Sequence, residues 1–211
     1  MDSHRVIWIL LVVLTVLGGV AIVGVAATRK TLPGGSQKQL TAGGGDKLVE
    51  RTVHDLRVGD VLTIDGKDFI CEGEIDYDED GHRWVGGRCV DGNDVRWVIV
   101  GLERAGTSAT RLLAQDETQQ ITGYPPEALV IGETRFTLDK RGTATCTLKG
   151  DVGPLGSDSK NRPEGHTERC RWWLYGAPGE DTMIVEQWGS DYRVLRGKKI
   201  NEGTIDLIPG S

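Results

Sequence analysis

The stretch DVLTIDGKDFICEGEIDYDEDGHRW, residues 60–84, gives the clearest indication of the fold. Apolar and polar residues alternate along it, and a period of two is typical of β-strands with one buried face. The dipeptide Asp65-Gly66 interrupts the alternation. Because Asp-Gly between alternating segments is a strong signal for a tight turn, the stretch predicts a β-hairpin at this point.

The end of this stretch carries the D-x-D-x-D-G pattern that opens a calcium loop, at Asp76, Asp78, Asp80 and Gly81. A complete loop of this kind needs a bidentate Glu at its twelfth position, which here is Gly87. The alternative is a β-turn over residues 78–81, whose Asp and Gly residues are good turn formers. We favour the turn and predict no metal site.

Further short alternating segments follow, each bounded by turn-forming residues: 96–103, 108–114, 133–150, 170–176, 182–189, 191–197 and 203–210. No amphipathic helical run separates them, which favours an antiparallel sandwich or barrel over β-α-β units. We therefore predict an all-β domain of antiparallel meanders over residues 48–211. A faint internal similarity, in which a strand ending at Cys71 matches one ending at Cys146, suggests two pseudo-repeats, at residues 48–114 and 128–208.

The N-terminal part of the chain predicts attachment to a membrane. Val6–Ala27 contains 22 residues without a charge, enough for a helix to cross a bilayer core of about 30 Å. A cleaved signal peptide is the alternative, but its apolar core is usually shorter, about 7 to 15 residues. We expect residues 1–30 to hold one transmembrane helix with its flanks, and the Gly-rich residues 31–47 to form a flexible linker.

Basic residues follow the apolar segment, at Arg29, Lys30, Lys38 and Lys47. By the positive-inside rule they favour a single-pass protein of the cell membrane whose folded domain is cytoplasmic. The chain as a whole has a formal net charge of −6. Because binding to a nucleic-acid backbone needs clustered Lys and Arg, we expect no nucleic-acid partner.

The cysteines fall into two candidate pairs, Cys71 with Cys89 and Cys146 with Cys170. If Tyr77 lies opposite His82 across the predicted turn, a strand bulge is needed to bring the first pair together. Two cross-strand disulfides would suit an exported domain. Free buried thiols would suit a reducing cytoplasm, and they go with the favoured orientation.

Catalytic and cofactor motifs are absent from the sequence. It contains no G-x-S-x-G, no H-E-x-x-H and no phosphate-binding Gly loop before a helix. His54 beside Asp55 and His166 near Glu168 have the spacing of ordinary surface pairs. We expect no catalytic, cofactor or metal site and lean against an enzyme.

The candidate contact surface is the pair Trp172 and Trp173. Consecutive residues of a strand point to opposite faces, so one of the two rings is a candidate to face solvent or a partner. A second β-layer that covers this face is the alternative.

The sequence resembles a bacterial family known as domain of unknown function 4178. The resemblance rests on these positions: Gly59-Asp60-Val61, Asp65 to Phe69, Tyr77 to Gly81, Arg83-Trp84 and Pro209-Gly210-Ser211. It implies a β-rich domain, often behind one N-terminal helix, in which the turn at residues 78–81 belongs to the fold. It implies no activity and no catalytic residues.

These observations favour a membrane-tethered β-domain that binds a protein partner or a small ligand in a bacterial envelope-associated system. An exported, disulfide-bonded domain that binds calcium is one alternative. An enzyme whose acids and histidines are assembled only by the fold is another.

Overall fold

The computed structural model describes residues 51–104, 109–155 and 163–210. Residues 48–211 form a compact unit by themselves. No helix among the described residues is long and apolar enough to cross a membrane. The predicted transmembrane segment Val6–Ala27 and the linker at residues 31–47 lie outside the described residues.

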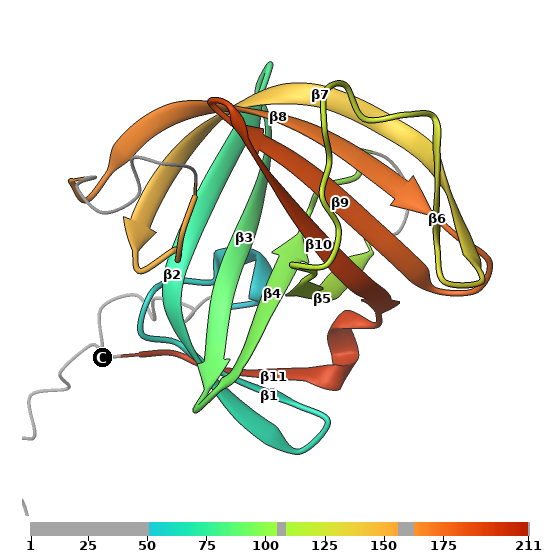
Figure 1. The fold of residues 1–211 in the computed structure, drawn as a ribbon. Coiled ribbons are helices and arrows are strands. Elements are labelled where there is room, and N and C mark those ends of the chain that lie inside the picture. The colour runs from blue at the N-terminus through green and yellow to red at the C-terminus, as the bar shows by residue number, and fades with distance from the viewer. Residues whose placement is uncertain (1–50, 105–108, 156–162, 211) are drawn as a thin grey trace, which may run out of the picture. The chain divides into compact units, whose positions relative to one another are not determined.

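The described chain is all-β, with two short 3-10 helices, as Figure 1 shows. The elements are η1 (Val53–Asp55), β1 (Val61–Ile64), β2 (Lys67–Glu79), β3 (His82–Asp91), β4 (Asp94–Val100), β5 (Thr110–Gln115), β6 (Ala128–Ile131), β7 (Thr134–Gly150), β8 (His166–Gly176), β9 (Asp181–Trp188), β10 (Asp191–Ile200), η3 (Glu202–Thr204) and β11 (Ile205–Ile208). All strand pairs are antiparallel, which confirms the all-β prediction.

The sheet closes into a barrel. Its strands follow the order β11-β1-β2-β3-β4-β5-β10-β9-β8-β7-β6, and an additional pairing of β2 with β7 closes the loop from β2 to β7. This is possible because β2 pairs with β1 along its first half and with β7 along its second half. Of the two predicted architectures, the structure is therefore the barrel, extended by β1 and β11 at one edge and by β6 at the other.

Two four-stranded meanders form the barrel, β2–β5 and β7–β10, joined by the β2–β7 and β5–β10 pairs. A four-residue strand precedes each meander, β1 in the first and β6 in the second. The long first strand of each meander has a bulge, which lies between Cys71 and Gly73 in β2 and between Leu138 and Lys140 in β7. β2 continues past Cys71 to Glu79, so the strand end expected at Cys71 is not observed. The origin of the two meanders by duplication stays a prediction.

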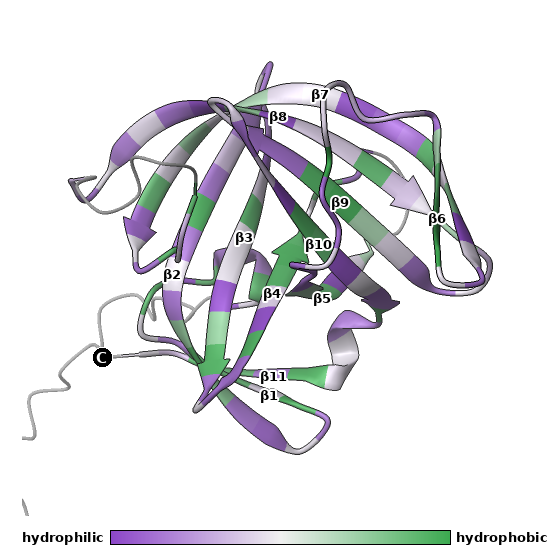
Figure 2. Ribbon diagram, viewed as in Figure 1, coloured by the Kyte–Doolittle hydropathy of each residue, from purple (hydrophilic) through white to green (hydrophobic). Residues whose placement is uncertain are grey.

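Hydrophobic and hydrophilic residues alternate along several strands, as the banding in Figure 2 shows. Where both faces of a strand are covered, alternate residues pack into different apolar clusters. In β8, Trp172 and Leu174 belong to the cluster inside the barrel, whereas Trp173 and Tyr175 pack on the other face. A third cluster lies under η1, β1 and β11, where Leu56 and Leu62 cover the outer face of β3 and β4. Burial of both faces explains why the sequence between residues 170 and 188 is so apolar.

The turn after β2 is tighter than predicted. Asp80 and Gly81 both have positive φ, 52° and 83°, as in the two-residue turn that matches the twist of paired strands. Tyr77 therefore lies opposite Trp84, and not opposite His82. The predicted four-residue turn over residues 78–81 is corrected to a two-residue turn, with Asp78 and Glu79 inside the strand.

Candidate functional site

A concave polar surface covers the outside of the barrel where β2, β7 and β8 lie side by side. It encloses about 780 Å³ and is lined mainly by Asp76, Asp78, Asp80, Arg83, Thr143, Thr145, Thr147 and Arg169, and we call it the polar face. The aspartates are those of the D-x-D-x-D-G pattern. The sequence pattern therefore indicated residues of this surface, although it was interpreted as a turn or the start of a calcium loop.

The strand register builds the polar face. Asp78 lies opposite Thr145 in the β2–β7 pair, and Thr145 lies opposite Arg169 in the β7–β8 pair. Residues directly opposite each other in antiparallel strands share one face of the sheet. The alternating segment Thr143-Ala144-Thr145-Cys146-Thr147 thus turns its hydroxyls outward, while Ala144 and Cys146 pack inside the barrel.

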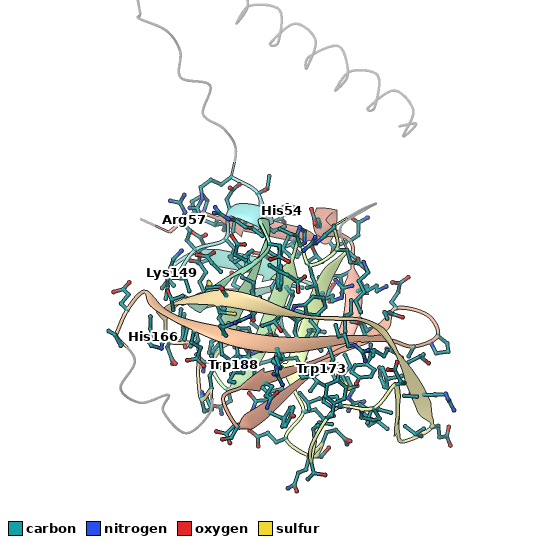
Figure 3. The ribbon with its side chains drawn as sticks, turned by 90° about the horizontal axis from the view of Figure 1, so that it is seen from above. His54, Arg57, Lys149, His166, Trp173 and Trp188 are labelled. Carbon is teal, nitrogen blue, oxygen red and sulfur yellow. The ribbon has the colours of Figure 1, made fainter. Side chains whose placement is uncertain are left out.

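A lysine holds the acidic residues of β2 together at one end of the polar face. The Lys149 ammonium lies 2.9 Å from Glu74 Oε1 and 2.7 Å from Asp76 Oδ2. Burial alone would lower the pKa of Lys149, but its hydrogen bonds to Asp76 and Glu74 raise it above the ordinary value. Burial raises the pKa of the Glu74 carboxyl, although Lys149 opposes the shift. Figure 3 shows Lys149 and His166 on the same side of the barrel.

Asp78 at the other end caps the turn. Its Oδ1 accepts a hydrogen bond from the Gly81 N–H at 2.9 Å, and its Oδ2 lies 3.0 Å from Arg83 Nε. These contacts, Gly81 first and then Arg83, lower the pKa of Asp78 below its ordinary value. Two aspartates of the calcium pattern are thus engaged by Lys149 and Arg83. No group of three acidic, His or Cys side chains among the described residues is placed to hold a metal ion.

Behind the polar face, a buried polar network crosses the barrel interior. The Glu186 carboxylate accepts hydrogen bonds from Tyr77 Oη at 2.8 Å and from Trp188 Nε1 at 3.0 Å. Arg193 donates to Glu186 Oε2 through Nε at 2.9 Å and also through Nη2. Its guanidinium lies 4.0 Å from the centroid of the Trp97 ring. No sequence motif indicated this network, although Glu186 and Trp188 share the inward face of β9.

Two side chains of the network, Tyr77 and Arg193, have pKa values above their ordinary ones. Burial, followed by the charge of Glu186, raises the pKa of Tyr77 well above its ordinary value. Burial alone would lower the pKa of Arg193, but the Glu186 carboxylate raises it. Tyr77 is 1% exposed and Arg193 is 4% exposed, so these groups are out of reach of a substrate in this structure. The network fills the barrel and fixes its aromatic side chains.

Both tryptophans of the predicted contact surface are buried. Trp172 is 5% exposed and packs edge-to-face against Trp84, with ring centroids 5.7 Å apart. Trp173 is 2% exposed and packs against Tyr124, under the layer that includes Leu129 of β6. In this structure neither ring reaches solvent, and the second layer considered as the alternative covers Trp173.

All four cysteines are free and buried. Cys170 lies opposite Ala144, two residues from Cys146 along β7. A bulge at Glu72 of β2 places Cys71 directly opposite Cys89, because without it the observed register would put Cys71 opposite Val90, and not opposite Arg88 as expected. A hydrogen bond with Cys71, followed by burial, raises the pKa of the Cys89 thiol. Burial and then a hydrogen bond with Cys146 raise the pKa of Cys170. Because the thiolate is the reactive form, Cys89 and Cys170 are poor nucleophiles in the folded protein.

The histidines do not form a catalytic arrangement with their carboxylates. His54 Nε2 lies 3.2 Å from Glu202, beside a hollow of about 730 Å³. Glu202 also accepts a hydrogen bond from the Thr110 hydroxyl at 2.9 Å. The carboxylate stands between the histidine and the hydroxyl, so His54 cannot take the proton of Thr110 as a nucleophile-base pair requires. His166 Nε2 lies 3.6 Å from Glu168 Oε2, and both residues belong to β8.

Comparison with known proteins gives a match to one protein-family model. No curated protein and no solved structure matches the chain significantly. A family model described as "Domain of unknown function (DUF4178)" matches residues 57–202, which span β1 to β10 and so the entire barrel. The chain therefore belongs to the DUF4178 family.

Proposed function

We propose that this protein is a membrane-tethered binding domain that recognises a polar, positively charged segment of a protein partner at the polar face. The observation that carries the proposal is the polar face itself, a concave surface with partly exposed carboxylates and a row of threonine hydroxyls on the outside of the barrel. Concave surfaces with a few convergent polar groups are the usual binding sites of proteins.

The filled interior supports an external site over an internal one. Eight-stranded barrels that carry ligands keep room for them inside. Here Trp97, Trp188 and Tyr77 are each at most 2% exposed, and the Glu186–Arg193 pair lies among them. A ligand inside the barrel would have to displace aromatic rings and break a buried ion pair.

The chemistry of the polar face indicates the partner. Asp76 and Asp78 keep 46% and 38% of their side chains exposed although each already contacts a cation. Asp80 is exposed at the turn. Lys or Arg side chains of a partner could contact these carboxylates, while the threonine hydroxyls accept and donate hydrogen bonds. Single exposed ion pairs contribute about 0 to 1 kcal/mol, so several contacts are needed together.

Membrane attachment through Val6–Ala27, in a single-pass topology with a cytoplasmic domain, completes the proposal. Its support is the uncharged 22-residue segment and the basic residues that follow it. Tethering would hold the polar face near the membrane and raise the local concentration of a membrane-bound partner, which compensates for weak individual contacts.

A photo-crosslinking amino acid in place of Thr145 tests the proposal in intact membranes. Thr137 is the matched control, because it is an exposed threonine of the same strand outside the polar face. We expect a protein adduct from position 145 and none from position 137. Asp78→Asn keeps an oxygen for the Gly81 N–H but removes the charge, and it should reduce the adduct. Equal adducts at both positions, or none at either, would contradict the proposal.

A second candidate, an exported disulfide-bonded domain, is favoured by one observation. Cys71 lies directly opposite Cys89, so a disulfide between them could form without rearranging the strands, whereas Cys170 lies opposite Ala144 and is offset by two residues from Cys146. Mass spectrometry under non-reducing conditions, on protein taken from its native membrane, separates the candidates. Four free thiols support the cytoplasmic domain, and two disulfides support the exported one.

A further inference from the structure

The two edge extensions of the barrel are built alike, but only one of them is completed. β1 and β6 are both four-residue strands. Each is joined by a two-residue turn to a long strand that has its bulge after the fifth residue. Position by position, Val61 of β1 corresponds to Ala128 of β6, and Thr63 corresponds to Val130.

On β1, a further strand covers the outer edge. β11 pairs antiparallel with it, with Val61 opposite Ile208 and Thr63 opposite Asp206. On β6, the corresponding edge has no partner among the described residues, since β6 pairs with β7 alone. Figure 1 shows β1 with β11 at one end of the molecule, and β6 at a free border.

The direction of the peptide groups shows which N–H and C=O groups of β6 point to its free edge. The Leu138 N–H donates to Glu127 O at 2.9 Å, so residue 127 faces β7 with its peptide groups. In antiparallel pairs the facing direction alternates. Leu129 and Ile131 therefore also face β7, whereas Ala128 and Val130 turn their N–H and C=O groups to the free edge. Neither makes another backbone hydrogen bond to a described residue.

We propose that β6 pairs antiparallel with β6 of a second copy of this chain, forming a twofold-symmetric dimer. The strand is self-complementary, because Ala128 of one copy can lie opposite Val130 of the other, and each such pair exchanges two hydrogen bonds. Leu129 then lies opposite Leu129 of the second copy, on the face that packs against the apolar cluster. The strand itself carries no charge, so no repulsion opposes the pairing.

The flanking residues select this register. Shifting it so that Val130 meets Val130 would place Glu127 opposite Glu133 of the second copy, and like charges directly opposite destabilise a sheet. Shifting it the other way would bring Pro126 opposite Val130, and proline has no N–H to donate. Val130 is 67% exposed in the single chain. Unpaired hydrophobic edges of this kind are templates for pairing with another chain.

Disulfide trapping of the full chain in its membrane tests the dimer. In a Leu129→Cys variant the new thiols lie opposite each other in a non-hydrogen-bonded pair, where Cα atoms are about 4.5 Å apart and a disulfide is geometrically allowed. The native cysteines are buried and give little background. We expect a covalent homodimer upon mild oxidation with copper phenanthroline. Thr137→Cys, on the neighbouring strand, should give none.

A second pair of variants separates the edge from the fold. Val130→Pro removes an N–H that points to the edge and leaves the β6–β7 hydrogen bonds in place, whereas Val130→Thr keeps the N–H. Sedimentation in detergent measures the dissociation constant of the dimer. Val130→Pro should raise this constant about tenfold or more, since each copy loses one hydrogen bond. The threonine should change it little. Circular dichroism checks that both variants fold.

The proposal is overturned if the wild-type chain sediments as a monomer at every concentration. It is also overturned if position 129 crosslinks to a different polypeptide and not to itself, which would make the edge a site for another strand. Equal homodimer yields at positions 129 and 137 would show collision without a defined interface.

Discussion

Replacing Arg193 by Leu tests whether the buried charges of the barrel compensate each other. Arg193 supplies two of the four hydrogen bonds that reach the Glu186 carboxylate, and it covers the Trp97 ring at 4.0 Å. In the variant, Glu186 keeps only two neutral donors, from Tyr77 and Trp188. The carboxylate would then be buried without a counter-charge.

The expected loss in the free energy of unfolding is large. Removing one partner of a buried ion pair costs about 3 to 5 kcal/mol, because the remaining charge is uncompensated. The two neutral donors to Glu186 favour the lower end, and the lost contact with Trp97 adds about 1 kcal/mol. We therefore expect a loss of about 4 kcal/mol. The double variant Arg193→Leu with Glu186→Leu should be more stable than Arg193→Leu alone by about 2 kcal/mol.

Urea unfolding of residues 48–211, followed by tryptophan fluorescence, measures these values. With an m value of about 2 kcal/mol/M, a loss of 4 kcal/mol moves the midpoint by about 2 M. A loss below about 1 kcal/mol for Arg193→Leu would mean that the buried carboxylate does not need its partner, contrary to this expectation. A double variant no more stable than Arg193→Leu alone would contradict it as well.

Three further outcomes are expected. Burial raises the pKa of Tyr77 well above its ordinary value and that of Tyr175 to about 12. Because these phenols ionise near pH 10 in the unfolded chain, the free energy of unfolding should stay constant below about pH 10 and fall between about pH 10 and 12. Urea midpoints measure this fall, and absorbance at 295 nm measures the ionisation. Gly197→Ala should lower stability by about 1 to 3 kcal/mol, because the added Cβ would overlap the Leu112 carbonyl; Gly203→Ala, with more space, is the control in thermal melts. The four buried thiols should react with an aromatic disulfide reagent only after unfolding, and fast labelling of the native protein would contradict their burial.

Local features of the fold could be predicted from the sequence because they depend on neighbouring residues. The Asp65-Gly66 turn lies where the dipeptide indicated, and both of its residues have positive φ. A bulge beside Cys71 was expected only if the two cysteines pair, and from a register with Tyr77 opposite His82. The observed register differs, and the extra residue is Glu72 of β2. The turn at residues 80–81 was placed too early, since Asp78 also has the composition of a turn residue but lies within β2.

Long-range features could not be predicted in the same way. The β2–β7 and β5–β10 pairs that close the barrel join segments far apart in the chain, and alternation within a strand does not specify its partner. β6 was not predicted as a strand, because four residues before a turn give too short a pattern. The polar face needs three strands in register, so the aspartates of β2 indicated only part of it.

Crosslinking from Thr145 and from Thr137 in intact membranes should be compared first, because it shows whether the polar face binds a partner. If the polar face binds a partner, position 145 gives a protein adduct that Asp78→Asn weakens, and position 137 gives none. If the two positions give the same result, the polar face is not the binding site.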